Sequence, residues 1–265
     1  MLSRNRALDT LLVLPAYNEA ENIGWVLDSL RDAGATEYAD VLVVDDGSSD
    51  DTGRIAKRRG FEVVTQVYNM GYGAALQTAY KYATDKGYSY LIQMDADGQH
   101  DIANIDIMLA KLKRSANNAN GPAPDIVIGS RFLEGAQSFS TSPIKRPIIA
   151  MFRWIVRRVT GTNITDPTSG LWGINRRTFR YLAVRDNFDI KYSDVNMILQ
   201  MLMLGYRIEE VPAIMHERVA GASMHTGVRK ALIYGIVMSF STWGAFVRCN
   251  KKMRRLKAAK KQEAK

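Results

Sequence analysis

Two aspartates one residue apart close an apolar stretch in LIQMDADGQH, residues 91–100. Residues i and i+2 of an extended chain point the same way, so the carboxylates of Asp95 and Asp97 face one spot and repel each other. A divalent cation relieves this repulsion, because Mg²⁺ commonly uses one or two carboxylates together with substrate phosphates. Gln99 adds an oxygen at the next i+2 position. The pattern predicts a metal site, and the alternative is a solvated turn or a helix cap formed by Asp97 or Asp101.

A second acidic pair lies in VVDDGSSDDT, residues 43–52. Asp45 and Asp46 follow two valines and precede Gly47, which is typical of a strand that turns into a helix. Carboxylates at such strand ends accept hydrogen bonds from a ribose or a base in nucleotide sites. Turn and cap chemistry is the alternative, and it accounts for Gly47 but not for two acids. The chain has neither a G-x-G-x-x-G motif after its first apolar run nor a Walker A motif, so a metal would have to supply positive charge to nucleotide phosphates.

The first half of the chain alternates apolar strand-like segments with segments of helical spacing. This alternation predicts a mostly parallel sheet with helices on both faces, in which ligands bind at the carboxyl ends of the strands. The expected strands cover residues 10–18, 40–48, 61–66, 88–94 and 125–130, and the expected helices cover 20–33, 50–59, 74–86 and 102–115. Polar residues gather at the strand ends, namely Tyr17, Asn18, Asp45, Asp46, Asn69, Asp95, Asp97, Ser130 and Arg131.

The second half is less regular and contains two segments that suggest a lipid surface. Residues 142–161 form a basic amphipathic pattern, as interfacial helices do. Residues 195–204 predict an apolar helix, and residues 206–212 predict the last strand. The stretch 231–247 has no charge over 17 residues, which is short for a membrane-spanning helix. Serines, a threonine and glycines dilute it, so we expect a helix lying in the membrane interface; the alternative is an ordinary buried helix followed by a disordered tail.

The distribution of charge narrows the class of partner. The net charge is +9, and the segment 248–265 contains nine Lys or Arg residues and one Glu, which leaves the body close to neutral. A nucleic-acid-binding domain usually carries a basic face on its folded body, so we expect no nucleic acid and favour an anionic membrane surface. The single cysteine excludes an internal disulfide and a cysteine-rich metal site. The first ten residues lack an apolar signal region, so we expect a cytoplasmic protein, peripheral on the inner face of the cell membrane.

Six motifs occur in the order and spacing of family 2 glycosyltransferases: LPAYNEAENI, VVDDGSSDDT, NMGYGAA, MDADGQH, GSRF and DPTSGLWGINR. Over roughly residues 10–225 the chain most resembles the polyprenyl-phosphate sugar synthases of the dolichol-phosphate mannose synthase group. The resemblance implies an α/β GT-A fold, with a mostly parallel central sheet flanked by helices and followed by C-terminal interfacial helices. It divides the chain into a glycosyltransferase domain, residues 1–225, and a membrane-surface anchor, residues 226–265.

The resemblance also implies roles for individual residues on the donor side. Pro15, Tyr17 and Glu19 would form the loop that holds the nucleotide base of a UDP- or GDP-linked sugar. Asp45 and Asp46 would contact base and ribose. The resemblance further implies that Mg²⁺ or Mn²⁺ is bound by Asp95, Asp97 and Gln99.

Other residues match the acceptor side of the family or the segments that surround the active site. Arg131 and Arg146 match arginines that bind the phosphate of a polyprenyl phosphate, although Arg146 taken alone reads as a solvated surface arginine. Ser169 and Gly170 match a turn near the active site. Arg218 and Ser223, in HERVAGAS, match a segment that closes over the diphosphate. Among the histidines, His100 would line the site or bond to its own backbone, and His216 would orient the loop.

The family inverts the anomeric carbon in a single in-line displacement, and an acceptor phosphate is already an anion that needs no general base. Asp194, however, resembles the acid that serves as general base in members that glycosylate sugar hydroxyls; a helix cap or a first-turn acid is the alternative. A second hypothesis is therefore transfer to a lipid-linked glycan or a cell-wall polysaccharide. A third is a catalytically silent scaffold recruited to the membrane, which the intact D-x-D-x-Q motif disfavours.

The chain lacks the clear C-terminal membrane spans of many relatives, which weakens the case for a prenyl acceptor or implies a separate membrane protein as partner.

Overall fold

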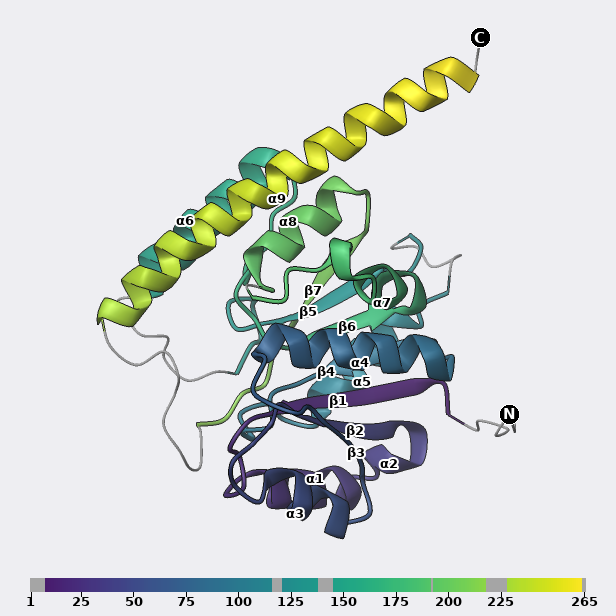
Figure 1. Ribbon diagram of the computed structural model, residues 1–265, viewed down its shortest axis with the longest axis vertical. Coiled ribbons are helices and arrows are strands. Elements are labelled where there is room, and N and C mark those ends of the chain that lie inside the picture. Colours follow the sequence, from purple (N-terminus) through teal and green to yellow (C-terminus); the bar gives the residue numbers. More distant parts are fainter. Residues whose placement is uncertain (1–7, 116–120, 138–144, 192, 218–227, 264–265) are drawn as a thin grey trace.

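A seven-stranded sheet runs through the part of the chain that the computed structural model describes, which is residues 8–115, 121–137, 145–191, 193–217 and 228–263. Its strand order is β3-β2-β1-β4-β6-β5-β7 (Figure 1). The strands are β1 (Thr10–Ala16), β2 (Asp40–Asp45), β3 (Glu62–Thr65), β4 (Tyr90–Gln93), β5 (Ile126–Ser130), β6 (Trp172–Asn175) and β7 (Ile208–Pro212). Each strand expected from the sequence is present within a few residues of its expected position.

The direction of β6 differs from that of its neighbours. β6 pairs antiparallel with β4 and β5, whereas the β1–β2, β1–β4, β2–β3 and β5–β7 pairs are parallel. The expected α/β fold with a mostly parallel sheet is therefore confirmed. Because β6 runs backwards, the residues that precede it lie at the same edge as the residues that follow β4 and β5.

Helices cover both faces of the sheet. One buried cluster joins Leu11 and Val13 of β1 to α4, α6, α7, α8 and α9, and the other joins Leu12 and Leu14 to α1, α3 and α5. This alternation follows from the two-residue period of a strand. The helices are α1 (Ile23–Asp32), α2 (Ala35–Tyr38), α3 (Thr52–Arg58), α4 (Tyr72–Lys86), α5 (Ala103–Leu112), α6 (Lys145–Thr160), α7 (Arg176–Leu182), the 3₁₀ helix η1 (Arg185–Asn187), α8 (Val195–Met203) and α9 (Val228–Glu263).

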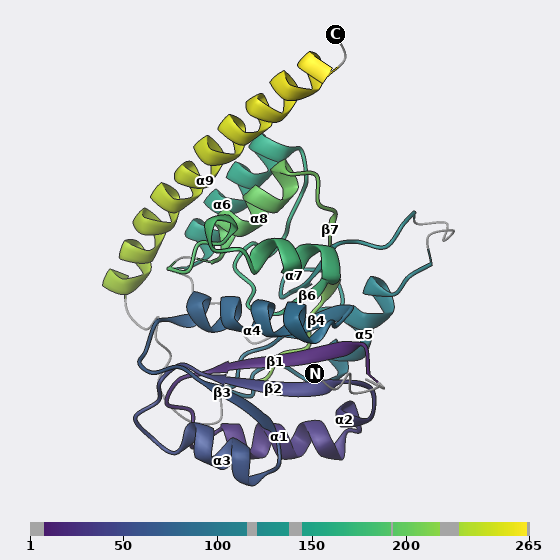
Figure 2. The same cartoon turned by 45° about the vertical axis from the view of Figure 1, so that its right-hand side comes forward.

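The long helix α9 lies beside α6 in both views (Figures 1 and 2). A Cβ atom at Gly235 would lie 3.5 Å from the Ile148 side chain, and the rings of Phe152 and Tyr234 are 6.5 Å apart. Met238 is buried in the core, so this part of α9 packs as a core helix does. The boundary expected at residues 225 and 226 falls outside the described residues and remains a prediction.

The outer face of α9 is apolar. Its exposed large side chains repeat at intervals of three and four residues, which places them on one side of a helix: Ile233, Ile236, Phe240, Trp243 and Val247. On the neighbouring helix, Met151 and Trp154 are also exposed. None of the described helices has the length and apolar character to cross a membrane.

Candidate active site

The loop after β1 is tied to the loop after β2. The Asn18 side-chain oxygen accepts the Ser49 backbone N–H at 2.9 Å, and Asn18 has the positive φ of 55° that asparagine tolerates. Pro15 lies in β1 itself, so the expected base-binding loop begins after it. Tyr17, 41 % exposed, and the half-buried Glu19 follow on this cross-linked loop. The expected contact with a nucleotide base remains a prediction.

Asp45 and Asp46 are both buried and both organise loops. The Asp46 carboxylate accepts the backbone N–H groups of Met70 at 2.8 Å and Gly71 at 2.7 Å, at the start of α4. The Asp45 carboxylate accepts the Ser48 N–H at 3.0 Å. These contacts with the loop after β2 and the loop before α4 explain in part why two acids follow each other. Their expected contacts with base and ribose remain predictions.

The expected metal ligands follow β4. Asp97 is 8 % exposed, and its Oδ1 accepts the Gln99 backbone N–H at 3.1 Å, so the turn considered as an alternative does form. The start of α5 is instead held by Asp101, whose Oδ1 accepts the Ala103 N–H at 2.8 Å. Within the described residues, no group of three or more His, Cys, Asp or Glu side chains is placed to hold a metal ion. The two carboxylates and the amide are hard oxygen donors, which fits an ion that shares its coordination with substrate phosphates.

Asp95 sits at the centre of the strand-end site. The Tyr72 hydroxyl donates to its Oδ1 at 3.1 Å, and His100 Nε2 lies 3.4 Å from its Oδ2. A Cβ at Gly170 would lie 3.0 Å from the same carboxylate, which explains the glycine in the turn before β6. Burial alone would raise the pKa of Asp95, but the contacts with His100 and Tyr72 and the charge of Arg131 lower it below its ordinary value. Asp95 is therefore ionised near neutral pH.

Arg131, at the end of β5, is already paired. Its Nε lies 2.7 Å from Asp166 Oδ2 and its Nη2 lies 2.8 Å from Asp166 Oδ1, a two-pronged contact with a fully buried carboxylate. The same Nη2 donates to Thr168 Oγ1 at 2.9 Å. Burial would lower the pKa of Arg131, but Asp166 raises it above its ordinary value. The charges of Arg131 and Asp95 influence each other, and two nitrogens of the Arg131 guanidinium are already bound to Asp166. The expected role of Arg131 in binding an acceptor phosphate remains a prediction.

Asp194 precedes α8, yet its side chain does not cap that helix. The Tyr234 hydroxyl of α9 donates to Asp194 Oδ2 instead. Burial and, to a smaller degree, the charge of Asp166 raise the pKa of Asp194 to about 6, against the opposing effects of Tyr234 and Arg131. The carboxyl therefore titrates near neutrality, as a general base requires, and the cap alternative does not describe it.

The roles of three further expected site residues remain predictions. Arg146 is exposed at the start of α6, and Arg218 and Ser223 lie outside the described residues. His216 Nε2 lies 2.7 Å from Asp101 Oδ2, and its backbone N–H donates to the carbonyl of Gln99 at 2.7 Å. This agrees with the expected role of His216 in orienting the loop.

Sequence reasoning missed three residues of the site. Tyr72 and Asp166 stand inside the quoted motifs NMGYGAA and DPTSGLWGINR, so their motif positions were a usable signal. Tyr234 stands in the uncharged stretch of the C-terminal helix, where no local pattern distinguishes it from its apolar neighbours.

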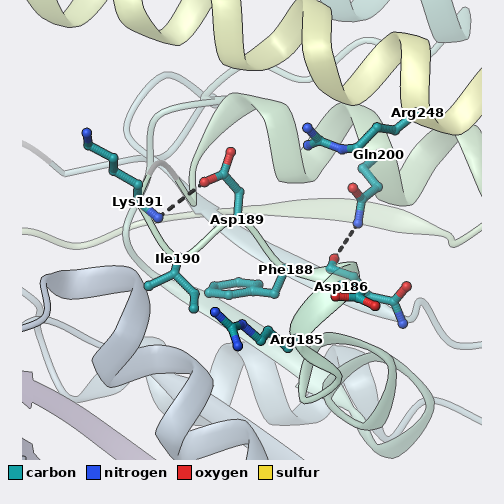
Figure 3. Close-up of a pocket in the computed structure, with 9 residues that line it drawn as sticks. Arg185, Asp186, Phe188, Asp189, Ile190, Lys191, Gln200 and Arg248 are labelled. Carbon is teal, nitrogen blue, oxygen red and sulfur yellow. Dashed lines mark hydrogen bonds between the residues drawn. The ribbon is translucent and has the colours of Figure 1, made fainter.

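A cavity of about 430 Å³ lies next to α9 (Figure 3). Its walls come from the segment 185–191, from α8 and from α9, and comprise Arg185, Asp186, Asn187, Phe188, Asp189, Ile190, Lys191, Gln200 and Arg248. None of them is an expected site residue. Asp189 is engaged there by Ser241, whose hydroxyl donates to Asp189 Oδ2 at 2.8 Å, so this wall also holds α9 to the body.

Comparison with known proteins gives concordant matches. The model of Glycosyl transferase family 2 matches residues 11–182. An undecaprenyl-phosphate mannosyltransferase of Micrococcus luteus is 32 % identical over 90 % of this chain and 95 % of its own length. A polyprenol monophosphomannose synthase of Mycolicibacterium smegmatis is 28 % identical over 84 % of each chain.

Two solved structures share the fold. A mannosyltransferase from Pyrobaculum calidifontis, in complex with GDP-Man and Mn²⁺, aligns with a TM-score of 0.58 at 19 % identity, covering 88 % of this chain and 64 % of that one. Glucosyl-3-phosphoglycerate synthase from Mycobacterium tuberculosis, in complex with Mn²⁺, UDP and glucosyl-3-phosphoglycerate, aligns with a TM-score of 0.62 at 16 % identity, covering 89 % and 79 %. Both are similar to this chain in architecture.

Proposed function

Because the chain belongs to glycosyl transferase family 2, we propose that it is an inverting enzyme that moves a hexosyl group from a nucleotide sugar to a polyprenyl phosphate. The observation that carries the proposal is that the Asp95 carboxylate, held by Tyr72, and the Arg131 guanidinium, held by Asp166, lie close enough for each charge to shift the pKa of the other. At the edge of the sheet where β4 and β5 end, the carboxylates are suited to a metal-bound nucleoside diphosphate, and the Arg131 guanidinium is suited to the phosphate of an acceptor. The relatives from Micrococcus luteus and Mycolicibacterium smegmatis support the acceptor class, because their names specify a polyprenyl phosphate or polyprenol carrier.

The donor half of the site would be built on the loops after β1, β2 and β4. Asp95, Asp97 and Gln99 would hold Mg²⁺ or Mn²⁺, and the Mn²⁺-bound structural relatives support a divalent ion. When bound, such an ion supplies the positive charge that stabilises a nucleoside diphosphate as leaving group. The protein's own contribution is to fix the two carboxylates through the Asp97 turn and the Tyr72 contact with Asp95.

The acceptor half needs positioning more than proton transfer. A phosphate monoester is an anion near neutral pH, so its attack on the anomeric carbon requires no general base. It requires cations that hold it in line against a donor of like charge. Arg131 faces the site from β5, and Asp166 fixes its orientation.

The surface formed by α6 and α9 supports a membrane location for this reaction. Exposed apolar side chains such as Phe240 and Trp243 line the outer face of α9. The basic segment 248–265 follows them directly. Apolar residues that insert at the headgroup boundary and cations that attract anionic lipids are the two features of interfacial binding. We propose that the protein sits peripherally on the inner face of the cell membrane.

One observation favours a second candidate, transfer to a sugar hydroxyl. A hydroxyl acceptor must lose its proton, and Asp194, with a pKa raised to about 6, is a suitable base. Asp194→Asn separates the two candidates in a transfer assay. Near-normal turnover favours a phosphate acceptor, and loss of several orders of magnitude favours a hydroxyl.

A donor panel tests the proposed function directly. Radiolabelled UDP-, GDP- and dTDP-sugars are incubated with the full chain and membranes, and the lipid-soluble product is then treated with mild acid. A glycosyl phosphate releases its sugar under these conditions, so an acid-labile product supports a polyprenyl-phosphate acceptor. An acid-stable product would shift the assignment to the hydroxyl candidate. Absence of transfer from every donor would instead favour a silent scaffold.

A further inference from the structure

Arg153 is a second arginine close to the acceptor side, and it differs from Arg131 because none of the described carboxylates forms an ion pair with it. It projects from α6, and its guanidinium carbon lies 4.3 Å from the centroid of the Phe132 ring. The guanidinium carbon of Arg131 lies 5.7 Å from the same ring. The Nε and Nη2 atoms of Arg153 are buried, and among the described residues neither of them makes a hydrogen bond.

Buried donors on a charged group are costly when nothing accepts from them, and native proteins satisfy nearly all such groups with protein, water or a bound ion. An anion at Arg153 would supply an acceptor for both donors and a counter-charge for the guanidinium. Arg131 has less to offer such an anion, because two of its nitrogens already donate to Asp166.

We infer that Arg153 binds the phosphate group of the acceptor, next to Arg131 and across the Phe132 ring. This inference rests on the proposed function and assigns it a further binding residue. The same helix also offers apolar surface to solvent. Met151 is 38 % exposed and Trp154 is 65 % exposed, so α6 carries exposed apolar side chains as well as the buried cation. A prenyl phosphate has the same combination of an anionic head and an apolar tail.

A phosphate could reach Arg153 from the acceptor or from the nucleotide donor, and a binding experiment on the full chain separates the two. The ligands are farnesyl phosphate, farnesol, UDP and GDP, each titrated against the wild type and against Arg153→Met. Methionine keeps an apolar stem over Phe132 and removes all the donors. Arg158→Met is the matched control, because Arg158 is an exposed arginine on the same helix.

We expect Arg153→Met to weaken farnesyl phosphate binding about 10- to 100-fold, since hydrogen bonds to a charged group contribute at that level. Farnesol, UDP and GDP should bind as they do to the wild type, and Arg158→Met should leave all four affinities unchanged. In a transfer assay Arg153→Met should raise KM for the prenyl phosphate without changing KM for the nucleotide sugar.

Three results would overturn the inference. If Arg153→Met binds farnesyl phosphate as tightly as the wild type does, Arg153 does not bind the acceptor. The proposed function would still stand in that case, provided that the wild type transfers sugar to a prenyl phosphate. Weakened UDP or GDP binding would assign Arg153 to the donor. A wild type that binds farnesyl phosphate no better than farnesol removes the acceptor class itself. If Arg153→Met does not fold, Arg153→Lys decides: several-fold weaker binding supports the fork-shaped contact, and unchanged binding contradicts it.

Discussion

The donor edge and the acceptor side of the site are held together in different ways. At the donor edge, carboxylates accept backbone N–H groups close by in sequence, as Asp97 does from Gln99 and Asp45 does from Ser48. On the acceptor side, charged side chains meet other side chains that are 35 and 40 residues away, in the Arg131–Asp166 and Asp194–Tyr234 contacts. The donor edge is therefore built mainly from carboxylates that accept backbone N–H groups, in local turns and in the longer-range contacts of Asp46 with Met70 and Gly71. The acceptor side is built from contacts between side chains that are distant in sequence.

This difference has an energetic consequence. When asparagine replaces an aspartate that holds a turn, the charge is lost, but the amide oxygen can still accept the hydrogen bond of the turn. A buried ion pair cannot lose one partner without leaving the other charge desolvated. Substitutions at the donor edge should thus change activity with little change in stability. Substitutions on the acceptor side should change both.

Asp97→Asn should give the largest effect on activity. The amide oxygen still accepts the Gln99 N–H, so the turn is kept, but a charge needed beside the nucleoside diphosphate is lost. We expect transfer to fall by about 10³-fold or more, which is about 4 kcal/mol of transition-state stabilisation. Steady-state transfer assays with Mg²⁺ or Mn²⁺ measure this, and a chelator added to the wild type should cause a similar loss.

Thermal unfolding supplies the control for Asp97→Asn, and the midpoint should stay near that of the wild type. Asp51 is half-buried and paired with Arg54 of α3, so it offers a matched substitution, and Asp51→Asn should leave transfer unchanged. Full activity of Asp97→Asn would contradict the metal site and, with it, the contrast between the two regions.

The same contrast explains how much the sequence could predict. The strands, the parallel sheet and the Asp95–Asp97 motif depend on local periodicity and turn chemistry, so pattern reasoning found them. Tyr234 reaches Asp194 only because α9 packs on α6 and α8, and no spacing within residues 228–263 indicates that contact. The antiparallel direction of β6 was also hidden, because a four-residue strand looks the same in either direction.

Arg131→Ala should give the largest loss of stability. Asp166 is fully buried and would remain as a desolvated charge without its two-pronged partner. Breaking a buried pair from one side costs about 3–5 kcal/mol in the free energy of unfolding. Urea denaturation measures this cost. Arg177→Ala is the comparison, because Arg177 is 58 % exposed in its pair with Asp125 and should cost about 1 kcal/mol or less. Equal losses of unfolding free energy in Arg131→Ala and Arg177→Ala would contradict the distinction between a buried and an exposed ion pair.

Asp194→Asn should change how stability depends on pH. The pKa of Asp194 is raised from its ordinary value of 3.8 to about 6. At pH values between 3.8 and 6, the folded state therefore holds the Asp194 proton more tightly than the unfolded state does. The wild type therefore gains stability from this group below pH 4 and loses it as the pH rises through 6. The loss is on the order of 3 kcal/mol.

The measurement is the free energy of unfolding at several pH values between 4 and 7.5, compared between variants. The decline should be smaller in Asp194→Asn by that amount. Asp186→Asn, at an exposed carboxyl on η1, should follow the wild-type profile. Identical slopes for wild type and Asp194→Asn would show that Asp194 is not desolvated by its neighbours.

Tyr234→Phe should give the smallest of these effects and the most specific test of how α9 is coupled to the site. It removes one hydroxyl and keeps the ring that packs against Phe152. Loss of the hydrogen bond to Asp194 should cost about 1 kcal/mol and raise the pKa of Asp194 further, because that bond favours the ionised carboxylate. The pH at which stability declines should therefore move upward, which loss of packing alone would not cause. Tyr181→Phe removes a hydroxyl of the body that accepts a hydrogen bond from Lys252 of α9 at 3.2 Å, and it should leave that pH unchanged. If both variants shift it equally, the coupling belongs to the docking of the whole helix; if only Tyr234→Phe does, one side chain connects the apolar surface of α9 to the acceptor side of the site.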